Sequence, residues 1–182
     1  MSVSIEHMRE MLRDAELICP AEQVQAALHR VAQQINTALA DTYPLVLSVM
    51  GGAVVFAGQL LPLLNFPLDF DYVHVSRYGD ATRGGEICWK VEPCENVRGR
   101  VVLVLDDILD EGHTLAALRQ RVMALGASGF YSAVFADKRH GKAKPIHADF
   151  VGMELPDRFV FGYGMDIEGV WRNLPAIYAL KE

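Results

Sequence analysis

Two kinds of hydrophobic pattern alternate along the chain, one typical of strands and the other of helices. Short runs of aliphatic residues, of which residues 101–105 form the clearest, are typical of strands that are buried on both faces of a parallel sheet. Apolar residues that recur at every third or fourth position, as in residues 115–125, predict amphipathic helices. This alternation over 182 residues predicts a single α/β domain around a mostly parallel sheet.

Further helices and strands are expected on both sides of this central run. Residues 4–40 have helical spacing and are expected to form two helices, separated at Pro20, that cover the sheet. The other strands are expected at residues 45–50, 69–77, 86–91, 130–136 and 149–155, with a buried helix at 53–64. The domain is therefore divided into a helical cover at residues 1–42, a core sheet at 43–155 and a C-terminal segment at 156–182.

Polar residues follow the central strand at the place where an α/β sheet binds its ligands. Asp106 and Asp107 come directly after the apolar run, and a polar turn at residues 110–114 leads into the next helix. Gly112 permits close backbone approach and Thr114 offers a hydroxyl near the helix start. Because helix N-termini bind anions, this turn is a candidate phosphate site, although an acidic pair alone is equally typical of a solvated loop.

Composition narrows the classes of function. The net charge of −6 argues against broad nucleic-acid binding and means that an anionic substrate needs local cations or a metal ion. Three cysteines without metal-ligand spacing fit a reducing cytoplasm. Residues 42–65 carry no charge, but Gly51, Gly52 and Pro62 interrupt them, so they are expected to form a buried strand, turn and helix rather than a membrane span.

Two motifs resemble those of one enzyme family. The order of two acids, two apolar residues, Asp, a variable residue, Gly, a variable residue and Thr at residues 106–114 resembles the phosphoribosyl pyrophosphate signature of type I phosphoribosyltransferases. Glu111 replaces the usual small hydroxyl residue, so the phosphate cradle is assigned to backbone N–H groups and Thr114. Residues 156–166, followed by 171–174, resemble the purine-binding segment of the hypoxanthine-guanine phosphoribosyltransferases.

The resemblance implies a complete set of roles. It implies a hood formed by the chain termini, including residues 156–182, and Mg²⁺-dependent transfer of ribose 5-phosphate from phosphoribosyl pyrophosphate to hypoxanthine or guanine, with Asp110 as the acid/base group at the purine N7. It implies that phosphoribosyl pyrophosphate is bound by Met50, Gly51, Gly52, Asp106, Asp107, Asp110, Glu111, Gly112, His113, Thr114 and Arg172. It implies that the purine is bound by Lys138, Phe159, Val160 and Asp166, and the metal ion by Asp106, Asp107 and Asp166.

Three further expectations come from the same resemblance. The Gly51-Gly52 turn binds pyrophosphate through its backbone, often after a cis peptide, whereas Met50 stands where several relatives have Lys and is not expected to bind through its side chain. Ser76, Arg77 and Tyr78 begin a flexible loop that closes over the site. The enzyme works as a homodimer or homotetramer on small-molecule substrates.

Two other functions remain open at this stage. The first is a phosphoribosyltransferase on the same fold that prefers xanthine. A comparison of base specificity distinguishes it from an enzyme that uses hypoxanthine or guanine. The second is a nucleotide-sensing regulator that keeps the site without catalysis. Such regulators usually carry a nucleic-acid-binding domain or a basic face, and this chain shows neither in its sequence.

Overall fold

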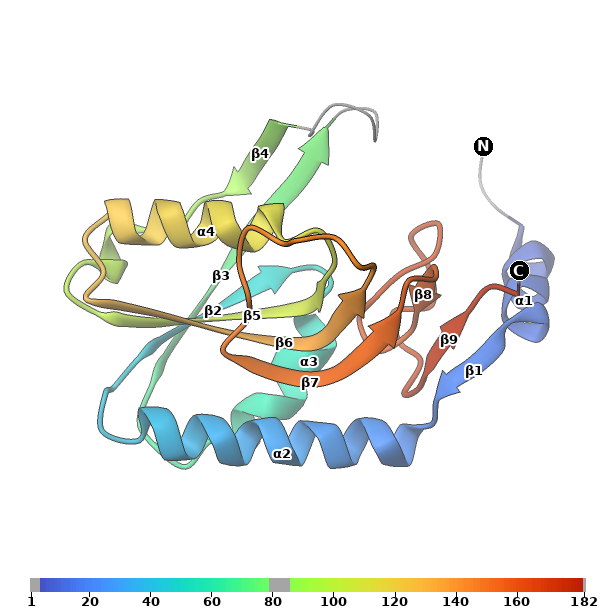
Figure 1. The fold of residues 1–182 in the computed structure, drawn as a ribbon, viewed down its shortest axis with the longest axis horizontal. Coiled ribbons are helices and arrows are strands. Elements are labelled where there is room, and N and C mark those ends of the chain that lie inside the picture. Colours follow the sequence, from blue (N-terminus) through green and yellow to red (C-terminus); the bar gives the residue numbers. More distant parts are fainter. Residues whose placement is uncertain (1–3, 79–85, 182) are drawn as a thin grey trace.

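The computed structural model describes residues 4–78 and 86–181, which form a main sheet with helices on both faces and a smaller sheet at one end (Figure 1). In these residues the main sheet has the strand order β4-β3-β2-β5-β6-β7. Its strands are β2 (Leu45–Met50), β3 (Asp69–Tyr78), β4 (Glu86–Val91), β5 (Val101–Leu109), β6 (Gly129–Arg139) and β7 (Phe150–Pro156). All neighbours pair in parallel except β3 and β4, which confirms the predicted fold class.

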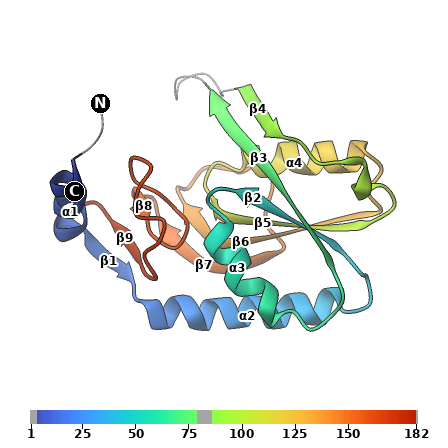
Figure 2. The same ribbon diagram turned by 180° about the vertical axis from the view of Figure 1, so that it is seen from behind.

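Alternating side chains of the central strand reach two separate hydrophobic clusters. Leu103 and Leu105 pack on the face covered by α2 (Ala21–Leu39) and α3 (Val54–Leu60), which continues into the 3-10 turn η1 (Leu61–Leu63). Val102 and Val104 pack on the opposite face, which α4 (His113–Ala124) covers. Figures 1 and 2 show α4 on one side of the sheet and α2 with α3 on the other. A strand buried on both faces explains the uninterrupted apolar run.

A second, antiparallel sheet joins the two ends of the chain. Its order is β1-β9-β8, where β1 is Glu16–Cys19, β8 is Val160–Phe161 and β9 is Ile177–Ala179. Figure 2 shows this sheet beside the end of the main sheet, with helix α1 (Ile5–Asp14) next to it. This arrangement is the hood that the resemblance implied, and it places the C-terminal motif beside the carboxyl ends of the core strands.

The prediction of two adjoining helices over residues 4–40 was wrong for the residues between them. A helix α1 (Ile5–Asp14) precedes strand β1, and Pro20 is the N-cap of α2 rather than its first residue. Residues 16–19 form a strand because they pair with a segment distant in sequence. Glu16 pairs with Ala179 and forms an ion pair of 2.8 Å with Arg158. Because α1 has no buried residue, α2 is the one helix within residues 4–40 that covers the sheet.

The expected start of the flexible loop also differs from the structure. Ser76, Arg77 and Tyr78 belong to strand β3, where they pair with residues 86–88 of β4. Strand pairing extends the regular backbone beyond the point at which the sequence pattern turns polar. The remainder of the predicted loop, residues 79–85, lies outside the described residues.

The uncharged stretch at residues 42–65 forms the expected strand, turn and helix, namely β2, residues 51–53 and α3 with η1. Among the helices in the described part of the chain, none is long and apolar enough to cross a membrane.

Candidate active site

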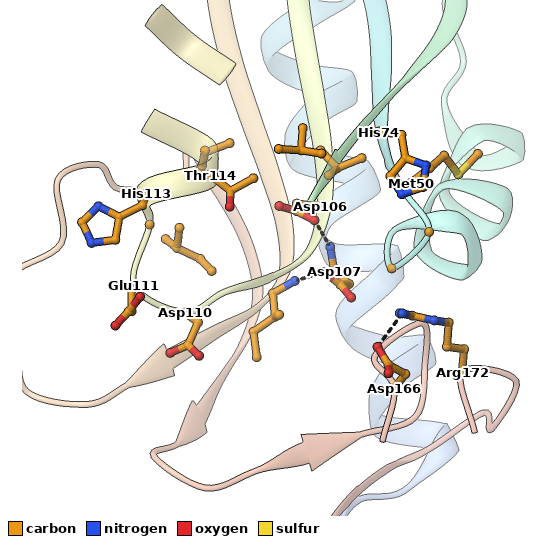
Figure 3. Close-up of a pocket in the computed structure, with 18 residues that line it drawn as sticks. Met50, His74, Asp106, Asp107, Asp110, Glu111, His113, Thr114, Asp166 and Arg172 are labelled. Atoms are coloured by element: carbon orange, nitrogen blue, oxygen red, sulfur yellow. Dashed lines mark hydrogen bonds and ion pairs between the residues drawn. The ribbon is translucent and has the colours of Figure 1, made fainter. Parts of the chain in front are cut away.

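A cavity of about 330 Å³ opens at the carboxyl ends of the core strands (Figure 3). Three segments distant in sequence line it: the turn after β2, the end of β5 with the start of α4, and the hood. The predicted residues that line it are Met50, Gly51, Gly52, Asp106, Asp107, Asp110, Glu111, Gly112, His113, Thr114, Asp166 and Arg172. The fold therefore gathers in one cavity every residue expected to bind phosphoribosyl pyrophosphate.

The acidic pair is held by its own backbone. The Asp107 N–H donates to Asp106 Oδ1 at 3.0 Å, and the Ile108 N–H donates to Asp107 Oδ1 at 2.9 Å. Burial raises the pKa of the Asp106 carboxyl well above its ordinary value, and the neighbouring Asp107 charge raises it further. Burial also raises the pKa of Asp107, while hydrogen bonds and the Arg172 charge act against that rise. Because burial opposes the ionisation of both carboxyls, a cation bound beside them would stabilise their charged forms.

The carboxylates of the cavity suit a Mg²⁺ ion that is bound jointly by the protein and by the substrate. In residues 4–78 and 86–181, no three His, Cys, Asp or Glu side chains gather closely enough to hold a metal ion by themselves. Mg²⁺ commonly takes one or two carboxylates together with substrate phosphate oxygens and water. Asp106 and Asp107 match this pattern. Asp166, the third expected ligand, forms an ion pair with Arg172 and accepts the Gly169 N–H at 2.8 Å.

The glycine turn after β2 packs against the acidic pair. A Cβ atom on Gly52 would overlap the Asp107 carboxylate, and one on Gly164 of the hood would overlap the Gly52 carbonyl oxygen. The peptide bond between Met50 and Gly51 is cis, as the resemblance implied. The absence of side chains at these positions lets the turn, the strand end and the hood meet directly.

The loop between β5 and α4 presents a helix N-terminus to the cavity. Gly112 caps α4 with a φ of +83°, a backbone angle that glycine adopts without strain. His113 and Thr114 form the first turn of the helix, whose N–H groups are not used within the helix. A phosphate bound here would be stabilised by these donors.

The hood supplies a guanidinium on the opposite wall. Arg172 forms an ion pair with Asp166 and donates through Nη1 to the Gly164 carbonyl oxygen at 2.6 Å (Figure 3). The hood therefore holds the Arg172 side chain through both a carboxylate and a backbone oxygen. Arg172 and Asp166 both line the cavity.

Of the residues expected to bind the base, Asp166 lines the cavity, whereas Lys138, Phe159 and Val160 are not part of its wall. Lys138 Nζ lies 3.4 Å from Asp110 Oδ2 and 3.9 Å from Asp157 Oδ1. Phe159 is 56% exposed, whereas Val160 is buried in β8. Asp110 belongs to the cavity lining and also contacts Lys138, so it connects the expected phosphoribosyl half of the site with the expected base half.

Sequence reasoning missed three basic residues around the site. His74 lines the cavity and pairs across the sheet with Met50, and the signal that could have identified it was a histidine within the strand expected at residues 69–77. His140 and Lys144 were not among the expected site residues, yet their side chains are each only 7% exposed. Their partners include the backbone oxygens of Leu109, the last residue of β5, and of Asp110 just after it, which a sequence pattern does not reveal.

Comparison with known proteins agrees with this geometry. A family model described as a phosphoribosyl transferase domain matches residues 18–168. The chain is 35% identical over 173 residues to the hypoxanthine-guanine phosphoribosyltransferase of Bacillus subtilis, an alignment that covers 94% of this chain and 96% of that protein.

Solved structures of phosphoribosyltransferases share the fold. A hypoxanthine-guanine phosphoribosyltransferase from Bacillus anthracis matches with a TM-score of 0.85 and 28% identity, over 91% of this chain and 98% of that one. A hypoxanthine phosphoribosyltransferase from Staphylococcus aureus matches with a TM-score of 0.84 and 26% identity, over 94% and 95%.

Proposed function

Because the chain belongs to the hypoxanthine-guanine phosphoribosyltransferase family, we propose that it transfers ribose 5-phosphate from phosphoribosyl pyrophosphate to N9 of hypoxanthine or guanine. The products are IMP or GMP and pyrophosphate, so the enzyme serves purine salvage. The observation that carries this proposal is Asp110, which lines the anion-binding cavity and contacts Lys138 of the base half.

The cavity suits a reaction in which a strongly anionic group departs. The anomeric carbon becomes cation-like as its bond to pyrophosphate breaks, so the site must hold the leaving group firmly. The N-terminus of α4 binds the 5-phosphate, and the Gly51-Gly52 backbone with Arg172 binds the pyrophosphate. Asp106 and Asp107 hold the ribose hydroxyls. The same two carboxylates would hold Mg²⁺, which would supply positive charge for the leaving group.

The base half selects a 6-oxopurine. Lys138 can only donate, so it matches the oxygen at C6 of hypoxanthine and guanine. A 6-amino group would face this donor with another donor, and unpaired polar groups discriminate strongly between substrates. The exposed ring of Phe159 stacks on the purine and the Val160 backbone reads its edge, with Asp166 nearby on the hood.

Asp110 is the acid/base group of the proposed mechanism. Its carboxylate lies 3.4 Å from Lys138 Nζ, and its side chain is 48% exposed in the absence of a base. A purine held by Lys138 at C6 presents N7 on the same edge, within the region that Asp110 occupies. Asp110 exchanges a proton with N7 while N9 attacks the anomeric carbon.

We extend the proposal to the whole protein. The 182 residues form one phosphoribosyltransferase domain that works in the cytoplasm, in keeping with its free cysteines, as a homodimer or homotetramer. The cover, core sheet and hood are parts of this one domain.

The proposal is tested by measuring pyrophosphate release from phosphoribosyl pyrophosphate with hypoxanthine. We expect release to require both the base and Mg²⁺, to stop on chelation and to return when Mg²⁺ is restored. Replacing Asp110 with Asn should lower kcat by about 10²–10⁴-fold, the usual contribution of general acid/base catalysis, while substrate affinity changes far less. Tight nucleotide binding without turnover of any base would instead identify a sensing protein.

A further inference from the structure

Residues 140–146, the first part of the segment that joins β6 to β7, lie directly against the loop that carries Asp110. A Cβ atom on Gly112 would meet Pro145 Cδ at 3.3 Å and both Lys144 Cβ and Ile146 Cγ2 at 3.5 Å. The segment also follows Lys138 by only a few residues. It is therefore in contact with both halves of the site without lining the cavity itself.

Lys144 ties the ends of two core strands together. Its Nζ donates to the Leu109 carbonyl oxygen at 2.6 Å, to the Lys138 carbonyl oxygen at 2.8 Å and to Asp137 Oδ1 at 2.5 Å. An ammonium group has three protons, so these three acceptors use all of them. Leu109 of β5 pairs with Asp137 of β6 in the sheet, and the lysine joins the strands beyond that pair.

The cost of burying this charge indicates that the arrangement is specific. The Lys144 side chain is 7% exposed, and a buried ammonium group is tolerated only when it is paired and fully hydrogen-bonded. Loss of the ammonium would leave two backbone oxygens and the Asp137 carboxylate without this donor.

His140 holds the backbone on the other side of Asp110. Its Nδ1 accepts the Lys142 N–H at 3.2 Å, so the proton of the neutral ring is on Nε2. Nε2 then donates to the Asp110 carbonyl oxygen at 3.1 Å. The carbonyl groups of Leu109 and Asp110 are thus both fixed by the 140–146 segment, as is that of Lys138.

We propose that Lys144 and His140 are positioning residues that set the spacing between the Asp110 carboxylate and the Lys138 ammonium. This inference rests on the proposed function, in which the two groups contact N7 and the C6 oxygen of one purine. Those atoms lie on the same edge of the base, so both contacts form only at one spacing of the two side chains. The segment therefore determines how well the site processes a 6-oxopurine.

The direct test is the variant Lys144→Met, which keeps the Cβ atom beneath Gly112 and removes only the donors. We expect kcat/KM for hypoxanthine to fall about 100-fold, the usual cost of misplacing a reacting group by about 1 Å. The KM for phosphoribosyl pyrophosphate should change less than about threefold, because the residues that bind it are retained. The control Lys142→Met removes an exposed lysine from the same segment and should behave as the wild type.

His140 provides a second test if Lys144→Met does not fold. Glutamine keeps a donor near the position of Nε2, whereas leucine removes it. His140→Gln should retain kcat within about threefold of the wild type, and His140→Leu should lose about tenfold, as expected for one lost hydrogen bond to a reacting group's backbone.

The outcomes separate this inference from the function on which it rests. A wild type that transfers to no 6-oxopurine contradicts the proposed function. An active wild type with unchanged kcat/KM in both Lys144→Met and His140→Leu contradicts only the positioning role. Equal losses in the kinetic constants for both substrates would show a merely structural role and would also overturn it.

Discussion

At the scale of single residues, the site is defined by groups that approach more closely than ordinary side chains permit. Gly52 and Gly164 bring the turn after β2 and the hood against the acidic pair, because neither position has room for a Cβ atom. The result is a pair of carboxyls, with Asp106 buried and Asp107 half-buried, whose position is fixed from several sides.

Gly52→Ala should therefore damage catalysis directly. The new methyl group would displace the Asp107 carboxylate or the turn, and a shift of about 1 Å at a reacting site costs on the order of 10²-fold in rate. Steady-state kcat is the measurement. Gly58→Ala is the control, because a Cβ atom there meets nothing within 4 Å in helix α3. Equal rates in the two variants would contradict the close packing of the turn.

The buried acidic pair predicts a gain in stability when one charge is removed. Folding raises the pKa of Asp106, so its carboxyl favours the folded state at low pH and opposes it increasingly as pH rises above about 4 through the raised value. Asp106→Asn should thus be more stable than the wild type at pH 7–8, and the difference should vanish near pH 4. Thermal unfolding with a chelator present measures this, and a wild type of equal or higher stability at pH 8 would refute it.

At the scale of helices and strands, one side chain connects the hood to the core. Tyr163 is buried, packs with its ring tilted against that of Phe135 of β6 at a centroid distance of 4.2 Å, and donates through its hydroxyl to Gln59 Oε1 of α3 at 2.9 Å. Burial raises the pKa of its phenol, so the hydroxyl remains a donor at physiological pH. The turn after β8 is thereby fixed to a helix that is distant in sequence.

Tyr163→Phe should keep the ring and lose this single hydrogen bond. The expected cost is about 1 kcal/mol of unfolding free energy, which lowers Tm by about 2–4 °C in a protein of this size. Tyr72→Phe, at a position 45% exposed, is the matched control and should leave Tm unchanged. A calorimetric scan in which the two variants coincide would contradict the role of Tyr163.

The helices and strands that could be predicted are those whose own residues show the hydrophobic pattern of a helix or strand. Residues 101–105 are apolar because β5 is buried on both faces, and the acidic motif follows because a parallel strand exposes its carboxyl end. Strand β1 could not be predicted, since its partner β9 lies about 160 residues away in sequence. Lys144 and His140 were missed for the same reason, because their acceptors are carbonyl oxygens at the ends of other chain segments.

At the scale of the whole molecule, an acidic protein is proposed to bind an anionic substrate, and the positive charge that this requires is confined to the cavity. The chain has a net charge of −6, yet the proposed substrate carries several negative charges. In the proposed mechanism, the N-terminus of α4, Arg172 and a Mg²⁺ ion held by the acidic pair would together supply positive charge in one cavity. Core sheet and hood each supply part of it, so the site depends on the complete domain.

Competition between bases tests the central claim most directly. The purified protein is incubated with phosphoribosyl pyrophosphate, Mg²⁺ and equal concentrations of hypoxanthine, guanine, xanthine and adenine, and the nucleotides formed are separated and quantified. We predict that IMP and GMP form and that AMP does not, because Lys138 requires an acceptor at C6. AMP as the main product, or XMP in excess of both IMP and GMP, would contradict the assignment of the base half of the site.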